Sequence, residues 1–277
     1  MKKNERAAAI VRTIVVSLIA VLFVVPLVWM VLSSLKTAPE VFARPFHWLP
    51  ARVQWQNYAT VWMNEEASML RAFANTLYIA LFSIIGQMFI SSLAAYSFAK
   101  INFKGKQVVF MLFLSSMMVP SQLTIIPRFM LFKTIGLYNN LWAIILPVFF
   151  GATSIFMLRQ FYMGLPNDLI EAAKIDGAGH LRIFLRIMLP LTKAALMSLI
   201  ILAFISSWNE YMAPLIFLVK KELYTVSQNI QWYMLDEFKE HNLTMAAATS
   251  AIVPVVILFI VGQKYFVEGI ATSGVKG

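Results

Sequence analysis

Long runs without a charged residue constrain this chain more than any other feature of its sequence. Residues 13–35 are 23 consecutive positions without Asp, Glu, Lys or Arg, and residues 72–99 form a second such run. A helix needs roughly 20 apolar residues to cross a bilayer core, whereas the apolar core of a signal peptide has only about 7–15. We therefore expect residues 13–35 to be a retained membrane helix, in which Pro26 introduces a kink.

Further apolar runs lie at residues 107–127, within 134–158, and at 194–219 and 242–263. Hydrophobic side chains make up 60% of the chain, only 13% of residues are charged, and the mean hydropathy is +0.74. These values exclude a soluble globular domain. The sequence therefore predicts an all-α integral membrane protein with six transmembrane helices. The chain has no cysteine, and its three histidines lie in separate loops, so we assign no metal site.

The apolar runs divide the chain into membrane and loop segments. The region between the first two runs is rich in proline, tryptophan and tyrosine, as expected of a loop at a membrane surface. The predicted organisation is a cytoplasmic N-terminus (1–12), a first span (13–35), an extracytoplasmic loop (36–71), a core with spans two to six (72–270) that includes a polar loop (165–190), and a cytoplasmic tail (271–277).

The basic residues predict the orientation. Six spans place both termini and the second and fourth connections on one side, which carries fourteen of the 23 Lys and Arg residues, against nine on the other. The positive-inside rule makes the fourteen-residue side cytoplasmic. The net charge of +10 is scattered between apolar spans instead of being clustered on one face, so it indicates membrane orientation and not nucleic-acid binding.

The polar loop 165–190 reads as two short helices with a sharp joint. Pro166 and Asn167 favour a helix start, and the first helix is expected over Asp168–Asp176 before Gly177, which suits a left-handed C-terminal conformation. A second amphipathic segment, Leu181–Met188, precedes Pro190.

One side of the first expected helix carries Leu169, Ala172, Ala173 and Asp176 at helical spacing. The two alanines give this side a low profile, so another protein could approach its backbone closely. From these residues alone, a plain connector between two membrane helices explains the loop equally well.

The chain carries no motif for chemistry of its own. It has no Gly-x-x-x-x-Gly-Lys-Ser/Thr run for nucleotide phosphates, no Ser/His/Asp set and no paired carboxylates on neighbouring spans, so we expect it not to be an enzyme. Glu210 stands nearly alone in the fifth apolar run, beside Asn209. A carboxylate at that depth either lines a path for substrate or makes a structural contact, and the residues leave both interpretations open.

Glu171-Ala-Ala-Lys-Ile-Asp-Gly-Ala178, followed by Phe184 and Leu189-Pro190, resembles the EAA loop of ATP-binding-cassette (ABC) importer permeases. The long outer loop after the first span, the Trp208-Asn209 pair and the C-terminal sequence resemble the smaller permease subunit of the maltose-type carbohydrate importers. The resemblance implies a type I importer permease fold with N- and C-termini inside, in a bacterial cytoplasmic (inner) membrane.

The resemblance also implies partners. These are a second permease subunit that forms a heterodimer with this chain, two cytoplasmic ATPase subunits that bind the ATP, and an extracytoplasmic sugar-binding protein. The chain itself would hold no cofactor, would contact membrane lipid and would bind no nucleic acid.

Site residues follow from the same likeness. The residues implied to couple to the ATPase are Glu171, Ala172, Ala173, Asp176, Gly177, Ala178 and Arg182. The tail implied to reach between the ATPase subunits consists of Ser273, Gly274, Val275, Lys276 and Gly277. The candidates for lining the pathway are Asn209 and Glu210. The implied function is ATP-driven import of a carbohydrate whose identity the sequence leaves open. The alternative is a self-contained secondary carrier or channel.

Overall fold

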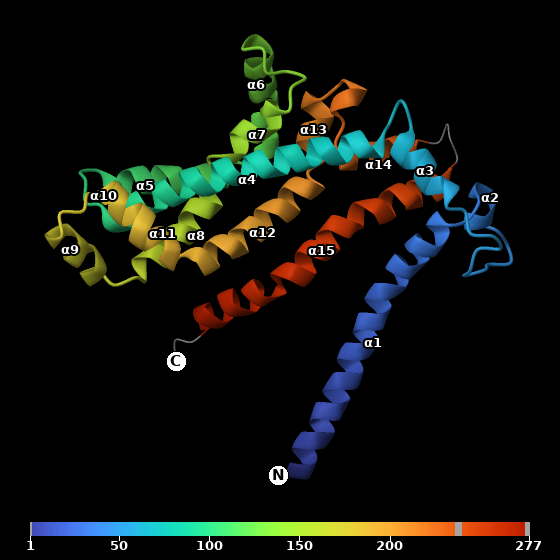
Figure 1. The fold of residues 1–277 in the computed structure, drawn as a ribbon, viewed down its shortest axis with the longest axis horizontal. Coiled ribbons are helices and arrows are strands. Elements are labelled where there is room, and N and C mark those ends of the chain that lie inside the picture. Colours follow the sequence, from blue (N-terminus) through green and yellow to red (C-terminus); the bar gives the residue numbers. More distant parts are fainter. Residues whose placement is uncertain (1, 236–239, 275–277) are drawn as a thin grey trace. The chain divides into compact units, whose positions relative to one another are not determined.

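The computed structural model describes residues 2–235 and 240–274 and, within them, the side chains of residues 8–235 and 240–263. All regular secondary structure in these ranges is helical (Figure 1). The elements are α1 (Lys2–Ser34), α2 (Ala38–Val41), α3 (Gln56–Met63), α4 (Met69–Lys100), α5 (Lys106–Ser115), η1 (Ser116–Met118), α6 (Ser121–Thr134), α7 (Trp142–Val148), α8 (Ala152–Met163), α9 (Asp168–Ile175), α10 (His180–Ile183), the π-helix η2 (Phe184–Met188), α11 (Leu189–Leu191), α12 (Lys193–Asn209), α13 (Met212–Phe217), η3 (Lys221–Leu223), α14 (Val226–Tyr233) and α15 (His241–Gly274).

Four helical stretches of the described chain are long and apolar enough to cross a membrane. They are Ala8–Ser34, Met69–Lys100, Trp142–Met163 and His241–Gln263. Two further pairs of helices meet the same criteria together but are sharply bent, by 98° between Lys106–Met118 and Ser121–Thr134 and by 76° between His180–Leu191 and Lys193–Asn209. The described chain therefore has six spans if each bent pair is counted as one.

In the middle of the chain, the spans expected at residues 107–127 and within 134–158 have other bounds, because the first continues as a bent pair to Thr134 and the second covers Trp142–Met163. The first of these breaks before α6, where Pro120 has an extended backbone (φ −57°, ψ 132°). Proline lacks the N–H that would continue a helix, which explains the break. The helix α6 then continues to Thr134, beyond the end of the expected run at residue 127, and the next span begins only at Trp142.

The described chain divides into two compact units, of which the first comprises residues 1–70 and 229–253. A buried amide organises this unit: Asn57 donates from Nδ2 to the carbonyl oxygens of Ser34 and Lys36, both at 2.8 Å, and Asn242 donates to Asn57 Oδ1 at 3.0 Å. These bonds fix the expected outer loop to the end of α1 and the start of α15.

The second unit, residues 71–228 and 254–277, contains the polar loop and most of the apolar core. One core cluster joins α4, α8, α9, η2 and α12 around Tyr96, Tyr162 and Phe184. A second cluster joins α4, α6, α7 and α13 around Ile145 and Phe217. The long helix α4 contributes to both clusters and is the structural axis of this unit.

Candidate functional site

The first helix of the polar loop forms almost as its sequence predicts. α9 covers Asp168–Ile175, and the N–H groups of Ile170 and Glu171 donate to the Asn167 carbonyl at 2.8 and 3.1 Å. The Asn167 side chain does not cap the helix; its Oδ1 instead accepts a hydrogen bond from Lys100 Nζ at 2.6 Å.

Gly177 forms the joint between the two helices. Its φ is +76°, its N–H donates to the Lys174 carbonyl at 3.0 Å, and the N–H of Ala178 donates to the Ala173 carbonyl at 2.9 Å. These two bonds form a Schellman motif, which satisfies the last carbonyls of α9 and requires a left-handed residue at this position. A residue with a Cβ would be strained there, although no neighbouring atom occupies the space.

The faces of α9 differ from the prediction. Ala173 is only 8% exposed and packs with Ile170 in the core cluster around Tyr96, so it does not share an exposed side with Ala172. The exposed residues include Leu169, Glu171, Ala172 and Asp176 of the predicted set. Another protein could therefore approach Ala172 closely on this helix, but not Ala172 and Ala173 together.

Sequence reasoning missed the most exposed apolar side chain of the loop. Ile175 is 86% exposed at the end of α9, and Leu181 is also exposed on α10, beside Arg182. The spacing of Ile170 and Ala173 could have identified the inner face of α9 and thereby placed Ile175 on the outer one. The loop thus presents apolar side chains within a polar surface, which is typical of a protein-binding site.

After α10 the backbone widens into the π-helix η2 and then bends. Thr192 is fully buried at the bend, where its hydroxyl lies 3.0 Å from the Leu189 carbonyl and 3.5 Å from the Tyr162 hydroxyl. Pro190 lies within α11, so the helical segment continues past this proline and ends at Leu191. The polar loop is consequently joined to α12 through a bent segment and not a straight helix.

A small cavity lined by both polar and apolar side chains lies between helices of the same unit. It has a volume of about 110 Å³ and is lined by Ser83 and Gln87 of α4, Ile144 and Val148 of α7, Ala203, Ser206 and Ser207 of α12, and Glu210. The Ser83 side chain is 1% exposed, and its hydroxyl has no hydrogen-bond partner among the residues that the structure describes. A buried hydroxyl of this kind is normally satisfied by water or a ligand.

Glu210 and its neighbours separate into different roles. Glu210 lines the cavity, and its Oε1 accepts a hydrogen bond from the Ala213 N–H at 3.0 Å. Asn209 is exposed and donates to the Ile205 carbonyl at 2.8 Å, and it is not part of the cavity lining. Trp208 is buried and stacks on Phe204 with ring centroids 5.5 Å apart.

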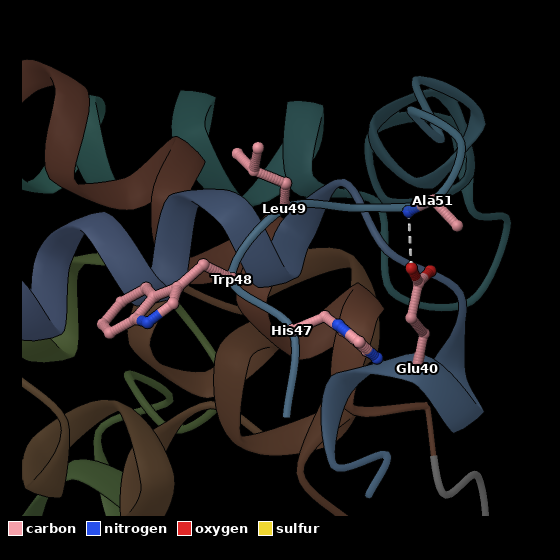
Figure 2. A pocket seen from close by; sticks show the side chains of 5 residues that line it. All are labelled: Glu40, His47, Trp48, Leu49 and Ala51. Atoms are coloured by element: carbon pink, nitrogen blue, oxygen red, sulfur yellow. Dashed lines mark hydrogen bonds between the residues drawn. The ribbon is translucent and has the colours of Figure 1, made fainter. Parts of the chain in front are cut away.

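The first unit has an open pocket of about 480 Å³ in the expected outer loop, lined by Glu40, His47, Trp48, Leu49 and Ala51. Figure 2 shows the Glu40 carboxylate accepting from the Ala51 N–H, at 2.6 Å. This bond is the largest of the effects that hold the pKa of Glu40 below its usual value; the Thr37 N–H, at 3.3 Å, and the charge of Lys36 act in the same direction. The carboxylate therefore serves to fold the loop.

The predicted C-terminal tail is only partly described. Ser273 and Gly274 lie at the end of α15, and Val275, Lys276 and Gly277 lie outside the described residues.

Bent candidate membrane spans, a cavity lined by residues of α4, α7 and α12, and an exposed loop with apolar side chains are the features of an α-helical membrane transport subunit. Residues 87–272 match the family described as binding-protein-dependent transport system inner membrane component. The chain belongs to this family.

Individual relatives agree with that assignment. The chain is 33% identical over 267 residues to the arabinooligosaccharides transport system permease protein AraQ of Bacillus subtilis, covering 96% of this chain and 95% of the relative. It is 29% identical to the diacetylchitobiose uptake system permease protein NgcG of Streptomyces coelicolor, over 94% of this chain and 86% of the relative. It is also 29% identical to the sn-glycerol-3-phosphate transport system permease protein UgpE of Pectobacterium atrosepticum, over 94% of each chain.

The fold is shared with a solved structure. A bacterial ABC transporter that imports the acidic polysaccharide alginate matches with a TM-score of 0.84 and 23% identity, over 95% of this chain and 98% of the other. The expected importer permease fold is therefore confirmed.

Proposed function

We propose that this chain is a permease subunit of an ATP-driven, binding-protein-dependent importer of carbohydrates. It forms half of the translocation pathway and couples to a cytoplasmic ATPase through residues 165–190, the coupling loop. Relatives whose names specify arabinooligosaccharides and diacetylchitobiose support an oligosaccharide substrate. Because another relative is named for sn-glycerol 3-phosphate, the test below includes this compound beside the oligosaccharides.

The observation that carries the proposal is the outer surface of the coupling loop. Ile175 at the end of α9 is 86% exposed, and Leu181 on α10 is also exposed. The charged Glu171, Asp176 and Arg182 are accessible as well. An apolar anchor with a polar rim is the usual anatomy of a protein interface. The ATPase is the partner that a chain without a nucleotide motif of its own requires.

The proposed location is the cytoplasmic (inner) membrane of a bacterium, with both termini and the coupling loop in the cytoplasm. The excess of Lys and Arg on that side supports this orientation. The assembly would add a second permease, two ATPase subunits that bind ATP, and an extracytoplasmic binding protein. The tail Ser273–Gly277 would reach between the ATPase subunits, and Glu210 would line the pathway at the cavity that it shares with Ser83.

The test combines loop variants with uptake of defined probes. Glu171→Lys reverses a charge on the exposed coupling surface, and Gly177→Asp places a Cβ at φ +76°. Gly136→Asp is the matched control, because Gly136 has φ +77° and equally free space but lies in the connection between α6 and α7. The probes are radiolabelled arabinotriose, diacetylchitobiose and sn-glycerol 3-phosphate.

We expect both coupling-loop variants to reduce co-purification of the ATPase and ATP-dependent uptake, while Gly136→Asp preserves both. Wild-type ATPase association and uptake in Glu171→Lys and Gly177→Asp would overturn the proposal. Uptake that persists without the ATPase and follows an ion gradient would identify a secondary carrier instead.

A further inference from the structure

One uninterrupted helix connects the coupling loop to the membrane cavity. α4 runs for 32 residues, from Met69 to Lys100, with Ser83 and Gln87 in the cavity lining and Tyr96 and Lys100 near its end. At about 1.5 Å per residue, Ser83 and Lys100 are separated by roughly 26 Å along the axis. In Figure 1, α9 and α10 lie at the end of α4 that carries Lys100.

Lys100 holds the entry of the coupling loop. Its Nζ donates to the Leu165 carbonyl and to Asn167 Oδ1, each at 2.6 Å. Hydrogen bonds from a charged donor are shorter and stronger than those between neutral groups. Because Asn167 is the residue before α9, these bonds fix where α9 begins relative to the end of α4.

Neighbouring cations do not share this role. Lys106 Nζ donates to the Ile101 carbonyl at 2.9 Å, and Arg159 Nε donates to the Phe98 carbonyl at 3.3 Å. Both side chains therefore bind the carbonyls at the end of α4 itself. Lys100 is directed toward the loop.

Tyr96 holds the other half of the loop. Its hydroxyl lies 3.1 Å from His180 Nδ1, at the start of α10. The Tyr96 ring is 3% exposed and packs beside Phe184 and Tyr162, with centroid distances of 5.5 and 6.1 Å. The two helices of the coupling loop are thus both attached to the last two turns of α4, one by Lys100 and the other by Tyr96.

The opposite part of α4 is equally well fixed to the cavity wall. Gly86 lies between Ser83 and Gln87, and a Cβ at this position would come within 2.1 Å of the Phe149 ring, just after α7. Gln87 Nε2 donates to Ser154 Oγ on α8 at 3.0 Å. A displacement of α4 along or about its axis must therefore alter the cavity that contains Glu210.

We propose that Lys100 and Tyr96 are positioning residues that make α4 the rigid connection between the coupling loop and the cavity. This inference rests on the proposed function, because it specifies how movement at the ATPase contact reaches the pathway. Apolar packing of Ile170, Ala173 and Phe184 keeps the loop on the protein, whereas the three hydrogen bonds made by Lys100 and Tyr96 set its orientation. Without them the loop can tilt while remaining docked on the ATPase.

The first experiment measures position directly in the full chain. The sequence contains no cysteine, so spin labels introduced at residues 89 and 175 have no background; Phe89 is an exposed position on α4 and Ile175 an exposed position on α9. We expect a narrow distance distribution in lipid nanodiscs. Lys100→Met preserves the length of the side chain but removes the donor, and should lower the population of the held orientation about tenfold. Lys100→Arg should restore it.

The controls separate this effect from a loss of charge or of folding. Lys104→Met removes a positive charge four residues further on, from an exposed side chain, and should leave the distribution narrow. Tyr96→Phe retains the buried ring but removes the hydroxyl, so it should broaden the distance distribution. Tyr78→Phe is the control on the same helix: the Tyr78 ring packs beside Phe82, and this variant should leave the distribution narrow. If Lys100→Met fails to accumulate, the exposed acceptor is changed instead: Asn167→Ala should broaden the distribution and Asn167→Asp should not.

The second experiment measures transmission in the assembled importer in liposomes, as uptake of the three probes above per ATP hydrolysed. We expect Lys100→Met and Tyr96→Phe to lower this ratio severalfold while the ATPase still co-purifies. An unchanged distance distribution, an unchanged ratio despite a broadened distribution, or loss of ATPase binding would each overturn the inference. If the wild-type chain neither binds an ATPase nor supports uptake while the distributions respond as expected, the proposed function fails and the positioning contacts stand.

Discussion

Two isoleucines on opposite faces of α9 allow the docking surface to be tested by one chemical change. Ile175 is 86% exposed, whereas Ile170 is 5% exposed and belongs to the core cluster around Tyr96. Replacing either with alanine removes three carbon groups. Each buried carbon group contributes about 0.8 kcal/mol, so a partner that covers the exposed 86% of Ile175 would contribute about 2 kcal/mol to binding.

This magnitude predicts how the two variants separate. Ile175→Ala should weaken ATPase association about 30-fold, because 1.4 kcal/mol corresponds to a factor of ten. It should leave the stability of the chain nearly unchanged, since the side chain is already exposed. Ile170→Ala creates a cavity in the core and should destabilise the chain by about 2–5 kcal/mol.

The assay titrates purified ATPase against the chain in nanodiscs and follows thermal unfolding of the same samples. Titration gives the change in affinity, and unfolding gives the change in stability. Equal destabilisation by the two variants, or an ATPase affinity of Ile175→Ala within about twofold of wild type, would refute the assignment of this face as the docking surface.

Two further predictions concern the cavity and the outer segment. Glu210→Gln keeps an acceptor for the Ala213 N–H but removes the charge, so the variant should fold normally and bind the ATPase as the wild type does. If substrate hydroxyls bind the carboxylate, the KM for uptake should rise about tenfold. An unaltered KM would show that Glu210 has a structural role only. Burial, and secondarily the charge of Glu240, raises the pKa of Tyr233 from 10.0 to about 12. The neutral Tyr233 hydroxyl donates to the Ala67 carbonyl at 3.1 Å. Its contribution to the stability of the first unit is therefore complete below pH 10 and decreases as the pH rises to about 12. Thermal unfolding across this range should show that loss in the wild type and not in Tyr233→Phe.

Much of the architecture could be predicted because bilayer crossing imposes length and polarity on the sequence. The run at residues 13–35 lies within α1 except for its last residue, and the run at residues 72–99 lies within α4. Gly177 adopts the left-handed conformation that its residue type favours. The family likeness followed from local residues as well, since the Glu171–Ala178 motif is contiguous in the chain. The roles given to the individual site residues remain predictions.

Only the tertiary structure determined which residues distant in sequence each of these segments contacts. Ala172 and Ala173 are equivalent in composition, but packing on Tyr96 buries one and leaves the other exposed. Lys100, Lys104 and Lys106 look alike in sequence, yet only Lys100 reaches the Asn167 side chain, 67 residues away. Local chemistry determined the helices, the joint and the membrane setting because these depend on neighbours along the chain; the docking face, the cavity and the contacts of α4 depend on residues that only folding brings together.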